Sequence, residues 1–511
     1  MNQKHSSRRK FLKNMFYSTL SITATAWLTN CSQQEKTPNI LFCISDDQSY
    51  PHTSAYGCSF VNTPAFDRVA EEGILFHNCF VSSPSCCPSR SSLLTGQAFY
   101  RLKESSMNHT IWPADFKVYP DILAAHGYFV GYTGKGWGPG NWKIAGRTHN
   151  PAGPVYNTAQ TKPPAKGMSN IDYYENFKLF LEKRSKDTPF CFWYGASEPH
   201  RVYEPGSGVR LNKKLEDVKV PQFFPDSNEV RTDMTDYAVE IEWFDSHMGM
   251  MIKLLEDMGE LDNTIIVVTA DNGMPFPRAK ATLYDYGTRM PLAIRWGNKI
   301  KSGRIVNDFV SFTDFAPTFL EAAKATIPEE MTGKSLMHIL KSSRLDRVEP
   351  ERDHAIFGIE RHFPGSRPDG AGYPMRAIRT EEYLYIRNYQ PELNPVGDCP
   401  GQAWPADDPT GGYGDTDGGL TKTYIFNNRK NDQKRFQLAF GKRPAEELYD
   451  VIKDPDNVNN LADNPDYAEV KKSLAERLQK ELAATGDPRA TSNAELFDKI
   501  LKKYSVIGSN L

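Results

Sequence analysis

The sequence NILFCISDD at residues 39–47 gives the strongest indication of the fold. Its first seven residues form a nearly unbroken apolar run, which is typical of a strand buried on both faces of a parallel sheet. The sequence TIIVVTADN at residues 264–272 has the same layout. Ligands of open α/β sheets bind beyond the carboxyl ends of the strands. Both segments therefore indicate a site at one edge of a sheet.

Helical and extended patterns alternate around these two strands. Thr63-Pro64 is typical of a helix start, and Gly73 separates that helix from another extended stretch. Apolar residues recur every three or four positions from Tyr237 to Leu255 and predict one face of a long helix that ends near Gly259. The alternation predicts an α/β fold, in which a doubly wound sheet carries helices on both faces.

The pattern changes near Tyr373. Short extended stretches follow, then a segment rich in Gly, Pro and Asp at residues 396–420, which predicts a long loop, and a helix at about residues 467–483. We therefore predict a large catalytic domain over residues 37–373 and a smaller C-terminal α+β domain over residues 374–511.

The first 30 residues are typical of an export signal. They contain five basic residues and no acidic residue, followed by a moderately apolar run. Residues 7–13 resemble the twin-arginine export motif, and residues 28–31 resemble a lipobox ending at Cys31. Lipidation of Cys31 is therefore predicted, with simple cleavage as the alternative because Asn30 is unusual at that place. The export machinery is an expected partner, and the expected location is the bacterial envelope, as a periplasmic protein or outer-membrane lipoprotein.

The composition excludes several classes of protein. Hydrophobic residues make up 39% of the 511 residues and charged residues 24%, as in a globular protein. No apolar run reaches the roughly 18 residues of a transmembrane helix, so membrane association is expected only through a lipid anchor. The net charge is −2 without a basic tract beyond the N-terminus, so no nucleic-acid partner is expected.

Four oxygen-bearing side chains follow the two predicted strands, namely Asp46, Asp47, Asp271 and Asn272. Three carboxylates at one sheet edge would repel one another unless a cation neutralised them. Oxygen ligands favour Ca²⁺ or Mg²⁺ over Zn²⁺, which prefers His and Cys. A single pair of such residues, Asp46-Asp47 or Asp271-Asn272, is more often part of a turn than of a metal site. Because both pairs directly follow predicted strands, a metal site is favoured.

The sequence SCCPSRSSLLTG at residues 85–96 predicts a short helix that begins near Pro88 and ends near Gly96. Cys86 would then lie at the N-terminal end of the helix, where an anion is stabilised. From these residues alone, a buried cysteine pair before a short helix is the alternative.

Residues 86–90, with the order Cys-x-Pro-Ser-Arg, and the Leu-Thr-Gly of residues 94–96 resemble the signature of the type I sulfatases. In that family the Cys is oxidised to formylglycine, which here implies modification of Cys86 and leaves Cys87 as a neighbour. The resemblance extends over nearly all of residues 37–511. Further motifs similar to those of the family are Gly134-Lys135, Glu198-Pro199-His200, and Lys280 with Tyr284 and Gly287.

The resemblance implies an alkaline-phosphatase-like fold, one Ca²⁺ ion, a sulfated saccharide as substrate and a formylglycine-generating enzyme as partner. The four oxygen ligands above and Cys86 would hold the ion. As hydrated formylglycine, Cys86 would supply the nucleophile. Arg90, Lys135 and Lys280 would stabilise the transferred sulfuryl group. His200 would be the acid for the leaving group, because the pKa of histidine lies near the working pH.

Residues 198–201, 271–277 and 373–376 are most similar to the heparan N-sulfatases. The predicted function is therefore exo-acting hydrolysis of sulfate from terminal N-sulfoglucosamine of heparan sulfate or heparin. Alternatives are an O-sulfatase for another sugar, a phosphomonoester or phosphonate hydrolase of the same superfamily, and a non-catalytic glycan-binding protein.

One departure from the family concerns Trp137, which stands where a His usually follows the Lys135 motif. The role of that His is unassigned in this chain. Trp137 is either a packing residue or a platform for a sugar ring. Arg201 and His362 are the other predicted substrate contacts, whereas His247, on the long helix, is expected to be structural.

Overall fold

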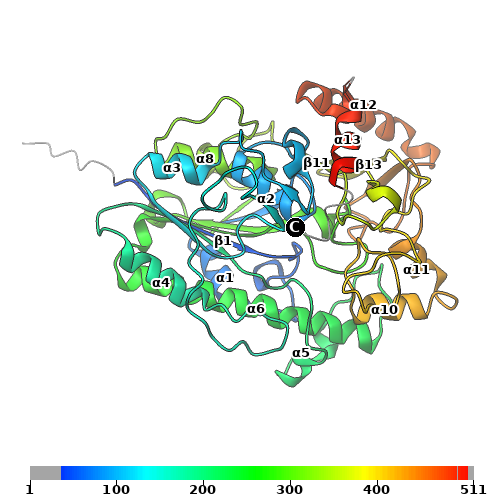
Figure 1. The fold of residues 1–511 in the computed structure, drawn as a ribbon, viewed down its shortest axis with the longest axis horizontal. Helices are drawn as coiled ribbons and strands as arrows, with labels where there is room; N and C mark the ends of the chain where they lie inside the picture. The colour runs from blue at the N-terminus through cyan, green and yellow to red at the C-terminus, as the bar shows by residue number, and fades with distance from the viewer. Residues whose placement is uncertain (1–35, 492, 505–511) are drawn as a thin grey trace, which may run out of the picture. The chain divides into compact units, whose positions relative to one another are not determined.

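The structure, a computed structural model, describes residues 36–491 and 493–504 (Figure 1). The predicted export signal over residues 1–30 and the predicted lipidation of Cys31 lie outside the described residues. Across the described ranges, no helix is long and apolar enough to cross a membrane.

Within residues 36–491, eight strands form a central sheet: β1 (Asn39–Ser45), β2 (Ile74–Phe80), β4 (Phe129–Gly134), β6 (Phe190–Gly195), β7 (Thr264–Ala270), β8 (Arg289–Arg295), β9 (Arg304–Val306) and β10 (Val310–Ser311). Their order is β10-β2-β8-β7-β1-β6-β4, with β9 also paired to β2. The strands β7, β1, β6 and β4 are parallel. Strand β8 is antiparallel to β7 and β2, so the predicted α/β sheet is of mixed type.

Strand β1 lies in the middle of the sheet and contributes to two hydrophobic cores. Ile40, Phe42 and Ile44 belong to one core, and Leu41 and Cys43 belong to the other. Successive side chains of a strand point to opposite faces of its sheet, so an uninterrupted apolar run fits a strand covered on both sides.

Helices cover both faces of the sheet, as predicted (Figure 1). One face carries α2 (Cys86–Thr95), α3 (Tyr119–Ala125) and α8 (Phe315–Ala322), and the other carries α1 (Pro64–Glu71), α4 (Tyr173–Lys183) and α6 (Asn228–Asp257). The predicted apolar face of the long helix is buried and includes Ile241, Phe244, Met248, Met251 and Leu255.

Helix α2 begins at Cys86, two residues earlier than the start near Pro88 that the sequence predicted. A proline is tolerated anywhere in the first turn, because the N–H groups of that turn have no partner within the helix. The helix ends as predicted at Gly96, whose φ of 64° gives a left-handed C-cap.

The four parallel strands end at the same edge of the sheet. Ser45 of β1 is in register with Ala270 of β7, and Gly134 of β4 is in register with Gly195 of β6. The segments that follow these residues carry most of the predicted site residues, so the register of the sheet brings them together.

Among the described residues of the C-terminal half, a second, antiparallel sheet contains β11 (His354–Ile359), β12 (Met375–Thr380), β13 (Tyr383–Asn388) and β14 (Glu446–Asp450). Strand β11 precedes residue 374, so this sheet includes residues on both sides of the predicted boundary, which itself stays a prediction. Other elements are α5 (Ser207–Arg210), α7 (Asp285–Thr288), α9 (Met337–Lys341), α10 (Leu420–Asn427), α11 (Gln433–Phe440), α12 (Ala468–Ala484), α13 (Glu495–Tyr504), β3 (Thr110–Ile111) and β5 (Gly140–Asn141).

A buried ion-pair network joins the second sheet to the C-terminal segment. The Glu360 carboxylate accepts from Arg376 at 2.7 Å and from Arg489 at 2.6 Å. Arg376 also pairs with Asp487, and neither side chain is exposed. Glu360 directly follows β11, so the network fixes the backbone that leads to His362.

Candidate active site

The ends of β1 and β7 bring together Asp46, Asp47, Asp271 and Asn272, each at most 2% exposed. The Asp47 N–H donates to Asp271 Oδ1 at 3.0 Å, and Asn272 Nδ2 donates to Asp47 Oδ1 at 2.6 Å. Asn272 Oδ1 is buried and accepts no hydrogen bond from the described residues. An unused amide oxygen beside three carboxylates fits a hard cation such as Ca²⁺.

The pKa values of these carboxyl groups also indicate a need for positive charge. Burial raises the pKa of Asp47 and that of Asp271 to about 7. Burial also opposes ionisation of Asp46, but the nearby charges, led by that of Lys135, hold its pKa well below the usual range. A divalent cation would stabilise the ionised form of all three groups.

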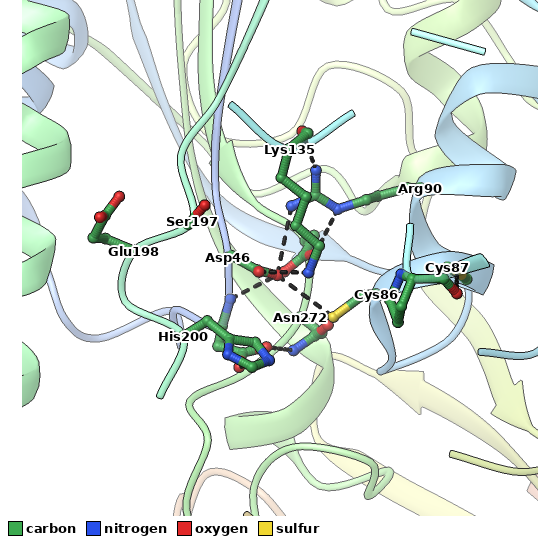
Figure 2. A network of polar contacts seen from close by, with 12 residues as sticks. Asp46, Cys86, Cys87, Arg90, Lys135, Ser197, Glu198, His200 and Asn272 are labelled. Carbon is green, nitrogen blue, oxygen red and sulfur yellow. Dashed lines mark hydrogen bonds and ion pairs between the residues drawn. The ribbon is translucent and has the colours of Figure 1, made fainter. Parts of the chain in front are cut away.

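Cys86, the first residue of α2, faces this cluster (Figure 2). Its Sγ lies 3.4 Å from Asp46 Oδ1, and the ligand atoms of Asp46, Asp47 and Cys86 lie within 4.8 Å of one another. Burial, with the charge of Asp46, raises the pKa of the Cys86 thiol well above its usual value. The unmodified thiol is therefore a poor nucleophile, although its position suits a group that acts beside a bound cation.

Three cationic side chains surround the carboxylates. Arg90 donates to Asp271 at 2.7 Å, Lys135 to Asp46 at 2.5 Å and Lys280 to Asp47 at 2.7 Å. Figure 2 shows Arg90 and Lys135 converging on Asp46 beside Cys86. The predicted sulfate-binding cations thus lie together, as stabilisation of a transferred anionic group requires.

His200 follows β6 and borders the cluster. Its Nδ1–H donates to the Arg201 carbonyl at 2.7 Å, so Nε2 carries the lone pair and lies 3.8 Å from Asp47 Oδ2. Burial, with the charge of Lys280, lowers the pKa of His200 to about 4. The imidazole is therefore neutral at rest, and the predicted role as an acid requires it to gain a proton during the reaction.

Asp417, from the loop at residues 396–420, was not predicted as a site residue. Its Oδ2 accepts from Lys280 Nζ at 3.0 Å, and its carboxylate lies with Asp47 and His200 in a second cluster whose ligand atoms are within 4.8 Å of one another. Asp417 makes a fourth carboxylate against three cations, so an added divalent cation would give the cluster one net positive charge. That charge suits an anionic substrate.

Trp404, from the same loop, is the aromatic residue that borders His200. The two ring centroids are 5.6 Å apart in an edge-to-face arrangement, and Trp404 is partly exposed. The Gly418 N–H donates to the Trp404 carbonyl at 2.7 Å, which ties Trp404 to the turn that carries Asp417. Trp404 is thus available to a ligand.

Trp137 occupies the protein interior. It is 3% exposed, its Nε1–H donates to Ser91 Oγ at 2.8 Å, and its ring packs edge-on against Trp112 at 5.3 Å. The structure therefore favours the packing alternative over the sugar platform. No property of the sequence near Trp137 indicates that Trp112 covers it.

Arg201 is held by the protein itself. Its two terminal nitrogens donate to Asp233 at 2.8 and 2.7 Å, and its Nε–H donates to the Pro275 carbonyl at 2.7 Å. Arg201 also lines the cavity beside the cluster, and its predicted contact with the substrate remains a prediction. His247 packs against Tyr173 in the interior, in keeping with the structural role predicted for it.

His362 lies against the start of α2. Its Nδ1 is 2.8 Å from Ser85 Oγ and 3.3 Å from Asn108 Nδ2. Asn108 Oδ1 in turn accepts the Cys87 N–H at 2.8 Å. These contacts place His362 beside Cys86, and its predicted contact with the substrate remains a prediction.

A cavity of about 200 Å³ opens beside the cluster, lined by residues that include Asp46, Lys135, Ser169, Glu198 and His200. Glu198 itself is satisfied, because it accepts from the Ser169 N–H and the Tyr173 hydroxyl at 2.8 Å each. The cavity gives a small group a path to the cluster of carboxylates and cations.

Oxygen ligands, a buried cysteine and three cationic side chains lie together at one edge of the α/β sheet. This arrangement is that of a hydrolase that acts on anionic groups. Comparison with known proteins identifies its family. The chain belongs to the sulfatase family, whose model matches residues 38–325. The C-terminal model of N-sulphoglucosamine sulphohydrolase matches residues 278–394.

The chain is similar to an ulvan-active sulfatase of Formosa agariphila, with 30% identity over 477 residues, 91% of this chain and 84% of the relative. It is 26% identical to human N-sulphoglucosamine sulphohydrolase over 494 residues, 88% of this chain and 91% of the relative. A solved structure in complex with D-glucosamine-2-N,6-O-disulfate has a TM-score of 0.64 at 22% identity and covers 88% of this chain and 99% of that chain. This last likeness shows the fold.

Proposed function

We propose that the protein hydrolyses the N-linked sulfate of terminal N-sulfoglucosamine in heparan sulfate or heparin. The observation that carries the proposal is the match of residues 278–394 to the C-terminal model of N-sulphoglucosamine sulphohydrolase. That range contains Lys280, which pairs with Asp47, and His362, which lies against the residue before Cys86. The matched region therefore contributes directly to the candidate active site.

Formylglycine made from Cys86 by a maturating enzyme would supply the hydroxyl nucleophile, and Ca²⁺ held by Asp46, Asp47, Asp271 and Asn272 would polarise the sulfuryl group. The position of Cys86 supports this role, because its Sγ lies 3.4 Å from Asp46 Oδ1, within the cluster of proposed metal ligands. Asn272 Oδ1, which is buried and has no hydrogen-bond partner among the described residues, supports the proposal that a metal ion binds here.

The remaining steps belong to residues of the chain. Arg90, Lys135 and Lys280 stabilise the charge of the transferred sulfuryl group within a buried site, where each charge has a larger effect than in water. His200 takes up a proton from solvent at Nε2 and passes it to the leaving nitrogen, since its Nδ1–H is held by the Arg201 carbonyl.

The small size of the cavity supports the proposed exo mode of action. A volume of about 200 Å³ suits a sulfuryl group with part of one sugar ring, not a continuous chain. The loop at residues 396–420 places Trp404 and Asp417 beside His200, which lines the cavity, and this supports recognition of a terminal residue.

The proposed setting is the bacterial envelope. The N-terminal sequence carries a twin-arginine-like motif and a lipobox-like motif ending at Cys31. We therefore include export and lipidation at Cys31 in the proposal. Radiolabelled palmitate incorporation by the full chain and by Cys31→Ser tests the anchor, and equal labelling of both would contradict it.

Hydrolysis of an O-sulfate on another sugar is the second candidate. It is favoured by the 30% identity to the ulvan-active sulfatase, which exceeds the 26% identity to the human N-sulphoglucosamine sulphohydrolase. Free sulfate released from N-sulfoglucosamine, glucosamine 6-sulfate and galactose 6-sulfate, each offered separately, distinguishes the two. Faster release from either O-sulfate would overturn the N-sulfatase proposal, and faster hydrolysis of a phosphate ester would overturn both candidates.

A further inference from the structure

We infer that Asp417 forms an amine subsite, where it accepts the N–H of a sulfamate and binds the ammonium group of the released glucosamine. The inference rests on the proposed function and deepens it, because it assigns recognition of the nitrogen to a residue outside the predicted site.

The first observation is that one oxygen of Asp417 has no protein partner. The residue is 6% exposed, and its Oδ2 accepts from Lys280 Nζ at 3.0 Å. No residue in the described part of the chain donates a hydrogen bond to Oδ1, and this oxygen is not among the fully buried atoms that lack a partner. Oδ1 is therefore open to solvent and can accept a hydrogen bond from a ligand.

The second observation is the place of Asp417 relative to the nucleophile. Asp47 belongs to both clusters: its carboxylate lies within 4.8 Å of the ligand atoms of Asp46 and Cys86, and also of those of His200 and Asp417. Asp417 and Cys86 thus both lie near the same carboxylate. In an in-line displacement the leaving atom lies opposite the nucleophile, and we place the leaving nitrogen of a sulfuryl group at Cys86 on the side of His200 and Asp417.

The third step is chemical. A sulfamate nitrogen carries a hydrogen, whereas the bridging oxygen of a sulfate ester carries none. An ionised carboxylate only accepts hydrogen bonds. Asp417 therefore attracts the N–H of a sulfamate and repels the bridging oxygen of a sulfate ester. When the N–S bond breaks, its electron pair stays on nitrogen and one proton from His200 gives the free amine. A second proton from solvent gives the ammonium group, which pairs with the carboxylate. A site built to bind an N–H rejects analogues that lack it.

The competing explanation is that Asp417 only orients Lys280. In that case its loss would slow N-sulfate and O-sulfate hydrolysis by the same factor, because Lys280 would stabilise the sulfuryl group of both. An amine subsite instead affects the nitrogen-containing ligand selectively. Binding of a ligand without sulfate separates the two explanations, since orientation of Lys280 is then irrelevant to the preference between sugars.

The test is calorimetric binding of glucosamine and glucose to the calcium-loaded, full-length enzyme at about pH 6, where the amine is protonated. We expect the wild type to bind glucosamine about tenfold more tightly than glucose, and Asp417→Asn to lose this preference. Asp417→Glu should retain part of it. Equal affinities in the wild type, or an unchanged preference in Asp417→Asn, would overturn the inference.

Asp408→Asn is the matched control. Asp408 lies in the same loop and forms an equally buried pair with Lys422 at 2.8 Å, but it belongs to neither cluster at the site. It should keep the preference for glucosamine, and loss of the preference here too would overturn the inference, because loop integrity would then be the cause.

Turnover separates this inference from the proposed function. Asp417→Asn should lose activity on N-sulfoglucosamine by about tenfold more than on galactose 6-sulfate. Equal losses would overturn the inference. A wild type that prefers O-sulfates, while its glucosamine binding still depends on Asp417, would refute the proposed function and support the amine subsite.

Discussion

Lys280 Nζ lies 2.7 Å from Asp47 Oδ2, and both side chains are buried, so a predicted sulfate-binding cation pairs directly with a predicted metal ligand. The contact joins the loop after β7 to the end of β1. The predicted metal site and the predicted sulfate site therefore share one carboxylate, and we expect changes at either residue to affect both.

Replacement of Asp271 by Ala should abolish the increase in melting temperature that Ca²⁺ gives to the wild type, and should abolish activity. The reason is loss of a cation ligand together with the partner of Arg90 at 2.7 Å. Thermal melts with and without added Ca²⁺ measure this effect. Asp245→Ala is the control, because Asp245 is a buried carboxylate that accepts the Ala65 and Phe66 N–H groups away from the site. It should lower the melting temperature yet keep the response to Ca²⁺, and a normal response in Asp271→Ala would refute the metal assignment.

Cys86→Ala should be inactive, whereas Cys87→Ala should keep most of its activity. Only the Cys86 thiol faces Asp46, while Cys87 Sγ lies 2.6 Å from the Pro139 carbonyl in the interior. Sulfate release by the two variants measures the difference. Peptide mass spectrometry adds a second readout, because formylglycine formation removes H₂S and adds one oxygen. Equal loss of activity in both variants would mean that the register of the signature is misread.

His200→Gln should reduce turnover of N-sulfoglucosamine by about 10²-fold or more, the contribution of a positioned proton donor. Its control is His247→Gln, which replaces a buried histidine of the interior and should change turnover little. Steady-state sulfate release provides the measurement. A His200→Gln enzyme within a factor of about two of the wild type would exclude the role of proton donor.

Trp404→Ala should raise KM for the sugar substrate by about 2- to 10-fold, the range expected for one aromatic contact. Trp137→Phe should instead lower the melting temperature with KM unchanged, because it removes the hydrogen bond to Ser91 in the core. Initial rates at varied substrate concentration, together with thermal melts, distinguish the two tryptophans. A raised KM in Trp137→Phe alone would restore the platform role predicted for Trp137.

The stability of the native state should decrease between pH 6.5 and pH 4, partly because of His247. Burial lowers the pKa of His247 to about 4, whereas an unfolded histidine titrates at about 6.5. The unfolded state therefore binds a proton that the native state excludes. The stabilisation is complete above pH 6.5 and is lost as the pH falls through this window, by about 3 kcal/mol at most. Urea unfolding at both pH values should show a smaller loss for His247→Gln, and identical losses would contradict this origin.

The two central strands and the oxygen-bearing side chains that follow them were predictable because residues 39–47 and 264–272 combine an apolar run with polar residues at its end. Parallel register then brings the two ends together, with Ser45 beside Ala270. The position of Cys86 was also predictable, since a proline in the first turn and Gly96 at the end delimit α2. Local sequence was sufficient to predict both the strand ends and the position of Cys86.

Asp417 and Trp404 were not predictable in the same way. They lie in a loop whose composition predicts only the absence of helix and strand, and their approach to His200 and Lys280 depends on tertiary contacts. The exposure of Trp137 likewise depends on Trp112, a residue 25 positions earlier in the chain. Such placements follow from packing between distant segments, which no local pattern encodes.

A competition between an N-sulfated and an O-sulfated sugar is the most direct test of the proposed activity. Equal concentrations of N-sulfoglucosamine and glucosamine 6-sulfate are mixed with the calcium-loaded enzyme, and NMR follows the disappearance of each. We predict that N-sulfoglucosamine is consumed at least about tenfold faster, because we infer that Asp417 binds the leaving nitrogen. Faster consumption of glucosamine 6-sulfate would contradict the N-sulfatase assignment.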